Sequence, residues 1–459
     1  MTASPSLIAL AFAAVLAAPV HALDLVETWR GAATHDADFA AARAAHAAGM
    51  ARRTQAGTLW RPGVTLEAGA GLVTNESAVR GAQFSAPGFG QTAGVAFDTS
   101  VNHGTSSRAV LALRQPLVSR EREVQQRQLE LAADIAEVQW QDARQALMLR
   151  AAERYFDAAL AAEQLRVLER QQTAVDRMRT EAQDRFRIGD RPVTDIHEAT
   201  ARAAGLTAQR LAAETDLALK RAALADLSGH APGASALALP GSLRAGGGAG
   251  PLEPWLDTAA QRNPGLRLAE AQLRLAEQEA RRTQAALAPS LDLVAQLGRE
   301  RLSGSGDFGS ASNSAGNRAI GLQLSVPLYT GGMRGARQTE AQALVDKAAA
   351  ELESQRRQTA RQTRSAWLEL SVGSGRTAAL DATLAASRAR LDATRVGLRA
   401  GDRTTLDLLN AENDAASAEL ALLQARARLL LDELRLAALA GLLDESRLQQ
   451  VNAALQSLP

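Results

Sequence analysis

The sequence contains no cysteine, which excludes disulfide bonds, thiolate metal sites and cysteine nucleophiles. It also excludes the lipid-bearing cysteine that some exported envelope proteins carry at the mature N-terminus. Aromatic residues are scarce, at 3%. Ala, Leu, Arg, Gln and Glu dominate long stretches, and this composition favours long helices over compact mixed sheets. The net charge is only +1, so neither nucleic acid nor a strongly charged partner is predicted.

Catalytic and metal-binding motifs are missing as well. The six histidines are scattered, and no pair has the spacing of metal ligands on a helix. The sequence has no P-loop, no nucleophile elbow and no dinucleotide-binding fingerprint. It therefore predicts no catalytic residue, no cofactor and no bound metal ion, and a protein that is not an enzyme.

Long hydrophobic runs are absent, apart from a short one near the N-terminus. Residues Leu7–Ala18 are apolar, which suits a signal-peptide core and is too short for a membrane-spanning helix. We predict a signal peptide at residues 1–22 with cleavage after Ala22, although no Lys or Arg precedes the apolar run. A buried N-terminal helix is the alternative interpretation.

The sequence does contain a large internal repeat. ARRTQA occurs at residues 51–56 and again at 280–285, and RIGDRPVTD (187–195) resembles RAGDRTTLD (399–407). These matches come in the same order, as expected from a tandem duplication. A stretch rich in Gly, Ala and Pro lies between the halves and is typical of a linker. We predict a first repeat at 23–229, a linker at 230–252, a second repeat at 253–445 and a C-terminal tail at 446–459.

Each repeat is expected to begin with one helix, Leu25–Leu59 or Pro254–Ala286, and to continue with two strands. Hydrophobic residues alternate with polar ones in residues 291–298 and 320–328, and more weakly in 64–73 and 109–113. Alternation over about ten residues is typical of a membrane β-barrel wall, although one such hairpin alone would suit a soluble protein. The Gly-, Ser- and Asn-rich connections, Thr74–Ser107 and Ser303–Asn317, are predicted to be loops.

A long helix is predicted after each pair of strands. No Pro or Gly interrupts residues 119–186, and apolar residues recur there at spacings of three and four, as in a coiled coil. Such a helix would be about 100 Å long and needs helical neighbours along its length. Gly189 and Gly401 are expected to end the two long helices, and return helices follow.

Two repeats supply four strands, which are too few to close a membrane barrel because the smallest known barrels have eight. Strands from several copies must therefore be combined, most simply in a closed cyclic oligomer. A dimer would supply eight strands and a trimer twelve.

The paired Gly-Asp-Arg turns at 189–191 and 401–403, the strand ending VPLYTGG (326–332) and the duplicated layout resemble TolC-type outer-membrane efflux and secretion channels. The resemblance covers almost the whole mature chain. It implies a mostly α-helical fold with a membrane β-barrel part: a homotrimer with a shared twelve-stranded barrel and a periplasmic helical tunnel. It also implies an outer-membrane location in contact with lipid, and a passive exit duct of an efflux pump or type I secretion system. Its partners would be a periplasmic adaptor and an inner-membrane transporter.

The resemblance also implies a closure at the periplasmic end. Thr194, Asp195 and Arg403 match residues that form its polar links, and Asp407 matches a ring of lumenal carboxylates. Asn410 stands where the family has a second carboxylate ring, and Leu398 replaces a linking tyrosine, so the closure should be less charged and held differently. Asp195 and Asp407 could instead only cap helices, and Arg403 could be a solvated surface charge.

Two other classes of protein remain as alternatives. A periplasmic adaptor also combines export with a long helical hairpin, but it has one hairpin rather than two equivalent halves. A filament-forming coiled coil is disfavoured by the proline breaks and the alternating strands.

Overall fold

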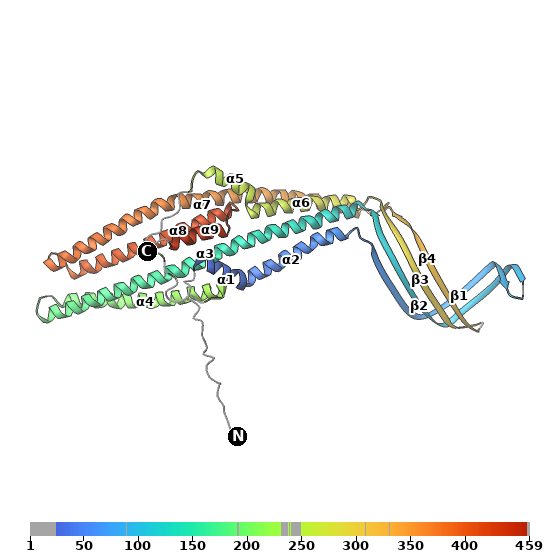
Figure 1. Cartoon of the computed structure of the whole chain (residues 1–459), viewed down its shortest axis with the longest axis horizontal. Helices are drawn as coiled ribbons and strands as arrows, with labels where there is room; N and C mark the ends of the chain where they lie inside the picture. Colours follow the sequence, from blue (N-terminus) through green and yellow to red (C-terminus); the bar gives the residue numbers. More distant parts are fainter. Residues whose placement is uncertain are drawn as a thin grey trace, which may run out of the picture. The chain divides into compact units, whose positions relative to one another are not determined.

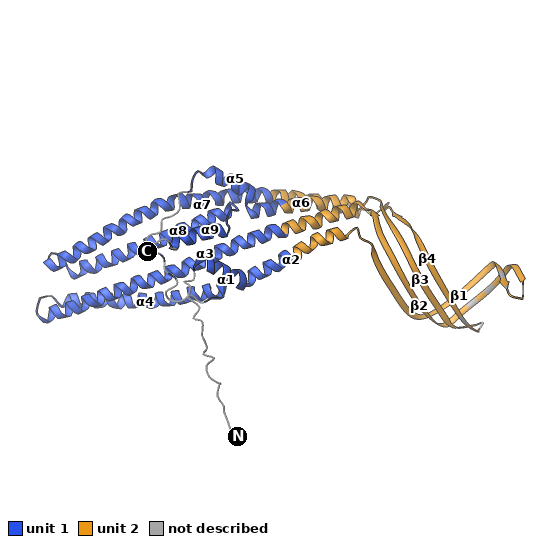
Figure 2. Cartoon of the chain, viewed as in Figure 1, with its two compact units in different colours: residues 1–47, 136–270, 351–459 blue, residues 48–135, 271–350 orange. Residues whose placement is uncertain are grey.

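The computed structural model describes residues 24–88, 90–190, 192–230, 237, 239, 249–307, 309–329 and 331–456. The predicted signal peptide and most of the predicted linker lie outside these residues. The chain forms two compact units, each assembled from separated segments (Figure 2). The first comprises residues 1–47, 136–270 and 351–459, and the second comprises residues 48–135 and 271–350.

The second unit contains one antiparallel sheet (Figure 1). Its strands are β1 (Gly63–Ala86), β2 (Gly90–Val118), β3 (Ser290–Gly306) and β4 (Gly309–Ser325), hydrogen-bonded in the order β1-β2-β3-β4. Each repeat supplies one hairpin, and β2 pairs with β3 to join them. Among the described residues of the chain, β1 and β4 each pair on one side only.

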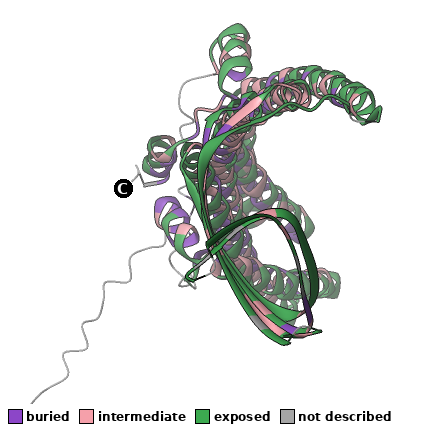
Figure 3. Cartoon of the chain, turned by 90° about the vertical axis from the view of Figure 1, so that its right-hand side faces the viewer, coloured by how far each residue is buried: buried purple, intermediate pink, exposed green. Residues whose placement is uncertain are grey.

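The register sorts the side chains into two faces, because directly opposite residues project to the same side of a sheet. On one side, here called the apolar face, lie Val64, Leu66, Leu111, Leu113, Leu293, Leu297, Ile320, Leu322 and Leu324. The other side, the polar face, carries Thr65, Glu67, Arg108, Arg114, Asp292, Gln296, Asn317 and Gln323. The apolar face is open: Leu66 is 71% exposed and Ile320 is 77% exposed. Figure 3 shows the predominance of exposed residues along the strands.

The two predicted loops were wrong. Most of Thr74–Ser107 and most of Ser303–Asn317 lie in paired strands that are much longer than ten residues. Their polar residues kept the alternation signal weak, yet antiparallel partners satisfy the backbone N–H and C=O groups regardless of hydrophobicity. Only the ends of the hairpins turn, with positive φ at Gly88, which follows β1, and at Gly90, the first residue of β2. The strand predicted at 320–328 ends at Ser325 because Pro327 has no N–H to donate.

The single opening helix predicted in each repeat was also wrong. The first divides into α1 (Leu25–His35) and α2 (Ala37–Thr58), and the second into α5 (Leu252–Arg262) and α6 (Pro264–Ala285). The residues at the breaks, Asp36 and Asn263, have extended ψ values of 121° and 124°. Proline disfavours the helical conformation at Asn263, whose Oδ1 accepts a hydrogen bond from the N–H of Leu266 at 2.9 Å.

The long helices are α3 (Arg120–Arg187) and α7 (Met333–Ala400), with 68 residues each. The return helices are α4 (Val193–Ser228) and α8 (Thr405–Leu439). A last helix, α9 (Glu445–Gln456), occupies most of the segment predicted as a C-terminal tail. None of the described helices combines the length and the apolar character that crossing a membrane requires.

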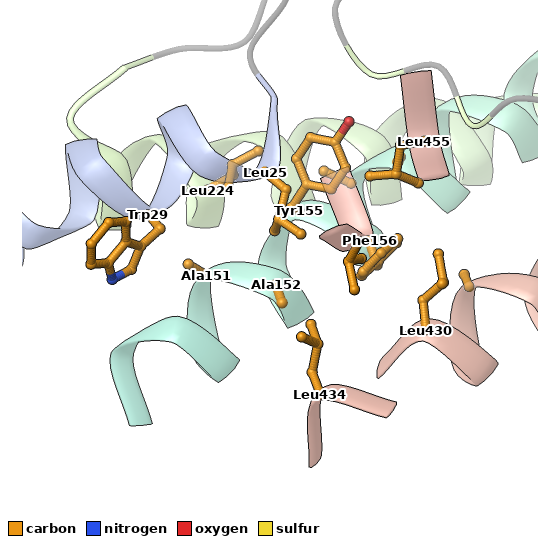
Figure 4. Packing of buried hydrophobic residues seen from close by; sticks show 14 of the residues in the cluster. Leu25, Trp29, Ala151, Ala152, Tyr155, Phe156, Leu224, Leu430, Leu434 and Leu455 are labelled. Carbon is orange, nitrogen blue, oxygen red and sulfur yellow. The ribbon is translucent and has the colours of Figure 1, made fainter. Parts of the chain in front are cut away.

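The main hydrophobic core lies in the first unit, where α1, α3, α4, α8 and α9 meet. Figure 4 shows its central side chains, including Trp29 of α1, Phe156 of α3, Leu430 of α8 and Leu455 of α9. Small residues such as Ala151 and Ala152 of α3 are fully buried in it, and they allow the helices to approach closely. In this core the short helices α1 and α9 pack against the long helix α3 and the return helices α4 and α8.

Candidate functional site

The two helical hairpins end in turns of identical design. Gly189 and Gly401 have φ values of 77° and 89°, which favour glycine. In each turn the N–H of the glycine donates to the carbonyl of the residue three positions earlier. The N–H of the following aspartate, Asp190 or Asp402, donates at 2.9 Å to the carbonyl of the residue five positions earlier. The repeated motif thus produces the same local structure twice.

The return helices, however, begin differently. Thr404 caps α8 in a reciprocal capping box: its Oγ1 accepts from the N–H of Asp407 at 3.1 Å, and Asp407 Oδ2 accepts from the N–H of Thr404 at 3.0 Å. The backbone and side-chain hydrogen bonds from Thr404 lower the pKa of Asp407. Pro192 stands at the equivalent position of α4 and makes no side-chain cap.

Because Pro192 offers no hydroxyl, the carboxylate equivalent to Asp407 is available for another bond. Asp195 Oδ2 accepts a hydrogen bond from Thr405 Oγ1 at 2.7 Å, and this bond links the start of α4 to the start of α8. Thr405 is only 8% exposed. A hydrogen bond to a carboxylate sheltered in this way typically contributes about 1.5–3 kcal/mol.

Apolar contacts surround this link. Leu398 and Met178 pack against a buried cluster formed by Leu391, Leu408, Ala411 and Ala415. A cavity of about 20 Å³ lies beside Asp195 and Thr405 and is also lined by Leu398. Leu398, which replaces the expected tyrosine, therefore contributes to the packing between the two hairpin ends.

The other predicted gate residues are not brought together within the chain. Thr194 and Asn410 are exposed on α4 and α8. Arg403 is exposed too and forms no hydrogen bond or ion pair with any residue that the structure describes, although its charge contributes to the lowered pKa of Asp407. Its stem lies against the helix, since a Cβ at Gly397 would come within 2.8 Å of Arg403 Cγ.

Sequence reasoning missed Thr405, which is the partner of Asp195. The alignment of the repeats pairs Thr405 with Val193. The sequence signal for the link was therefore this difference: only one of the two equivalent helix starts has a hydroxyl at that position. It also missed the ion pairs along the second hairpin, Arg395–Glu412 at 2.5 Å and Arg390–Asp414 at 2.9 Å. These join α7 to α8 behind the turn.

A second candidate site is a cavity on the polar face of the sheet, within the second unit. This cavity of about 820 Å³ is lined mainly by polar-face residues such as Thr65, Arg114, Gln296 and Gln323. Arg114 donates to Asp292 Oδ2 at 2.5 Å, and Asp292 is only 2% exposed. Among the described residues, no group of His, Asp and Glu side chains could hold a metal ion.

Residues 30–230 and 255–442 match the family described as outer membrane efflux protein. The chain belongs to this family. It is 29% identical over 334 residues to the outer membrane protein TolC of Escherichia coli, covering 71% of this chain and 67% of TolC. It is also 29% identical over 357 residues to the proteases secretion protein PrtF of Dickeya chrysanthemi, covering 76% of each.

Solved structures of the family share this fold. The outer membrane protein VceC of Vibrio cholerae superposes with a TM-score of 0.70 over 91% of this chain and 96% of VceC, at 20% identity. Family membership identifies the chain as a TolC-type efflux or secretion channel of the outer membrane, with its helices in the periplasm. The family and these relatives are channel proteins, and nothing in the comparisons supports the periplasmic adaptor alternative.

Proposed function

We propose that three copies of the chain form one duct, with a twelve-stranded barrel in the outer membrane. The observation that carries this proposal is the sheet, which has four strands, one openly exposed apolar face and two edge strands. Exposed hydrophobic faces and unpaired edges are unfavourable in water. Lipid would cover the apolar face, and pairing of β1 with β4 of a neighbouring copy would close the ring, since three times four strands is twelve.

The polar face would then surround the channel. Its cavity of about 820 Å³, with Arg114 and Gln323 among its lining residues, belongs to the water-filled interior in this arrangement. The two repeats, 23–229 and 253–445, each contribute one hairpin to the barrel and one pair of long helices to a periplasmic tunnel. The helices α3 and α7 provide about 100 Å of tunnel wall.

The duct works with a periplasmic adaptor and an inner-membrane transporter, which supply recognition and energy. TolC-type relatives support this assignment, and PrtF is named for the secretion of proteases. The channel itself is a passive conduit for efflux or secretion. It is opened at the periplasmic end by its partners.

The ends of the helical hairpins form the closure in this proposal. The bond from Thr405 to Asp195 supports the role, because it restrains the two hairpins of one copy against each other. Arg403, exposed and unpaired among the described residues of its own chain, is available to a neighbouring copy. Thr194 would share that contact, and Asp407 and Asn410 would line the narrow opening.

The mass of the purified particle tests the proposal. In detergent, with the detergent contribution subtracted, light scattering should give about three times the mass of the mature chain. Membrane fractionation should recover the protein with the outer membrane, and extraction should require detergent. A monomer, or a protein that stays in solution without detergent, would contradict the shared barrel.

A further inference from the structure

Beyond its hydrophobic rows, the apolar face of the sheet becomes basic. Leu66, Leu111 and Leu297 share a row with Arg318. In the next two rows Arg299 and then Arg301 project to the same side. Three arginines therefore gather at one level of β3 and β4, on the face that the proposed function assigns to lipid.

These arginines have no partner in the part of the chain that the structure describes. All three are exposed, and none forms a hydrogen bond or ion pair with a described residue. The acidic residues of the neighbouring rows, Glu67 and Glu300, project to the polar face instead. Like charges held this close on a sheet repel each other, so the cluster favours an anion supplied from outside.

A shallow depression lies directly beside the cluster. Its volume is about 550 Å³, and the apolar-face residues that line it are Ala68, Ala70, Ser107, Ala109, Arg299 and Arg301. The first four side chains are small, so they leave the depression above β1 and β2, and Arg299 and Arg301 of β3 border it. A charged headgroup with a bulky polar body could lie on these small residues and reach the guanidinium groups.

The level of the cluster in the membrane follows from the strand geometry. The hydrophobic rows run from Leu291 to Leu297, about 20 Å at about 3.3 Å per residue, which is close to the apolar band of about 25 Å in membrane barrels. The strands join helices at one end of the sheet, and the paired residues Ala86 and Gly90, and Gly306 and Gly309, lie at the opposite end. Because the helices are periplasmic, the arginines stand at the outer boundary of the hydrocarbon layer.

We propose that Arg299, Arg301 and Arg318 form a binding site for the phosphate groups of glycolipid headgroups in the outer leaflet of the outer membrane. The guanidinium groups bind phosphate oxygens, and the small residues of β1 and β2 accommodate the sugar. This site rests on the proposed function, because it requires the apolar face to be covered by lipid. It anchors the height of the barrel in the membrane, since phosphate groups occur only at the headgroup level.

The test measures binding of lipid A to the full-length protein in detergent by native mass spectrometry. The probes are diphosphoryl lipid A, the same lipid without its phosphates, and inorganic phosphate. The variants are the triple substitution Arg299→Gln, Arg301→Gln and Arg318→Gln, the corresponding triple lysine substitution, and Arg281→Gln. Arg281→Gln is the control: Arg281 is an exposed arginine of α6, so this variant loses a positive charge that does not belong to the sheet.

The triple glutamine variant should bind diphosphoryl lipid A at least about tenfold more weakly than the wild type. The triple lysine variant should keep most of the affinity, because a lysine still attracts phosphate as a point charge. Arg281→Gln should bind as the wild type does, and the lipid without phosphates should bind the wild type weakly.

Three results would overturn the site: equal binding by the triple glutamine variant, equal loss in the lysine variant, or displacement of lipid A by inorganic phosphate at the same concentration. The last would identify a site for free anions. Each of these three results counts against the site only when the wild type is a trimer recovered from the outer membrane. A wild type that is monomeric or absent from that membrane contradicts the proposed function instead, so the two failures are distinguishable.

Discussion

At the scale of single residues, the two ends of the helical hairpins differ by one exchange with large consequences. Thr404 caps its helix and engages Asp407, whereas Pro192 leaves Asp195 available to Thr405. The two equivalent carboxylates therefore have different roles: Asp407 stabilises the start of α8, and Asp195 links the two hairpins. The duplication has become asymmetric where the proposed closure lies.

Replacement of Thr405 by valine tests the link. Valine keeps the shape of the buried side chain but cannot donate to Asp195, so a restraint of about 1.5–3 kcal/mol per copy is weakened. The closed channel should conduct more in planar bilayers. Thr383→Val is the matched control, since this exposed hydroxyl bonds only its own helix at Ala379. Equal conductance of Thr405→Val and wild-type trimers would count against the link as part of the closure.

Asp407 can be divided into its charge and its capping role. Asp407→Asn removes the charge while its amide oxygen can still accept the capping bond, and Thr404→Val removes the capping hydroxyl while the charge stays. If a carboxylate ring lines the opening, cation selectivity and block by trivalent cations should fall in Asp407→Asn and persist in Thr404→Val. Reversal potentials and block titrations measure both.

Asn410→Asp should strengthen the block, because it adds a carboxylate about 5–6 Å away from Asp407 on the same helix face.

The lowered pKa of Asp407 means that the Asp407 carboxylate stays charged at mildly acidic pH. Block of the wild-type channel by trivalent cations should therefore disappear only below the usual pH range of carboxyl titration. Loss of selectivity in Thr404→Val alone would identify Asp407 as a helix cap without a lumenal role.

At the scale of elements, short terminal helices complete the core of the first unit. The N–H of Leu25, at the start of α1, donates to Asn452 Oδ1 of α9 at 3.1 Å, and Asn452 Nδ2 donates to Asp24 at 2.8 Å. Beneath this contact, Tyr155 of α3 is only 4% exposed. Burial raises the pKa of Tyr155 to about 12, and the charge of Asp24 acts in the same direction.

The raised pKa predicts a loss of stability in alkali. A phenol whose pKa is higher in the folded than in the unfolded state stabilises the fold below about pH 10, and this contribution is lost as the pH rises through about 12. Its size is roughly 2–3 kcal/mol, because each tenfold change in the ionisation equilibrium corresponds to about 1.4 kcal/mol. Tyr155→Phe should therefore lower the sensitivity of the thermal unfolding midpoint to pH between about 10 and 12.

Circular dichroism of the helices in detergent measures this midpoint. The matched control is Tyr329→Phe, because the chain has only two tyrosines and Tyr329 is 88% exposed. Other groups that titrate in alkali are common to all three proteins, so only the difference between variants is interpreted. An identical pH dependence for Tyr155→Phe and the wild type would show that another group controls alkaline unfolding.

At the scale of the whole molecule, the open sheet is the feature that a single chain leaves incomplete. Its edge strands β1 and β4 belong to different repeats. Closure by neighbouring copies would turn both edges into paired strands and place every hydrophobic row against lipid. The duplication thus supplies a first and a last strand that can meet only between copies.

Cysteine cross-linking tests this closure, and the absence of natural cysteine makes introduced thiols unique. Ile320→Cys in β4 is combined in turn with Val64→Cys, Leu66→Cys or Ala68→Cys in β1. At least one pair should form disulfides that give dimers and then trimers on denaturing gels, with no larger species, because the ring closes at three. The single variants control for random contacts. Chains longer than trimers would contradict a closed ring.

The sequence alone determined the features that depend on nearby residues. Spacings of three and four predicted the long helices α3 and α7, and glycines at 189 and 401 predicted their ends, because helix and turn conformations depend on contacts within a few residues. Alternation of hydrophobic residues identified which side of each strand is apolar. The repeated motif indicated the duplication and, through the family resemblance, the channel.

Tertiary structure decided the rest, because strand pairing and helix contacts join residues that are distant in sequence. The polar parts of β1 and β2 form strands only because each supplies the other's hydrogen-bond partners. The bond from Thr405 to Asp195 joins residues 210 positions apart, and the arginines of β3 and β4 form one cluster only in the observed register. A periodic pattern shows which way a side chain points along its own element, but only the packing of elements decides which side chain it meets.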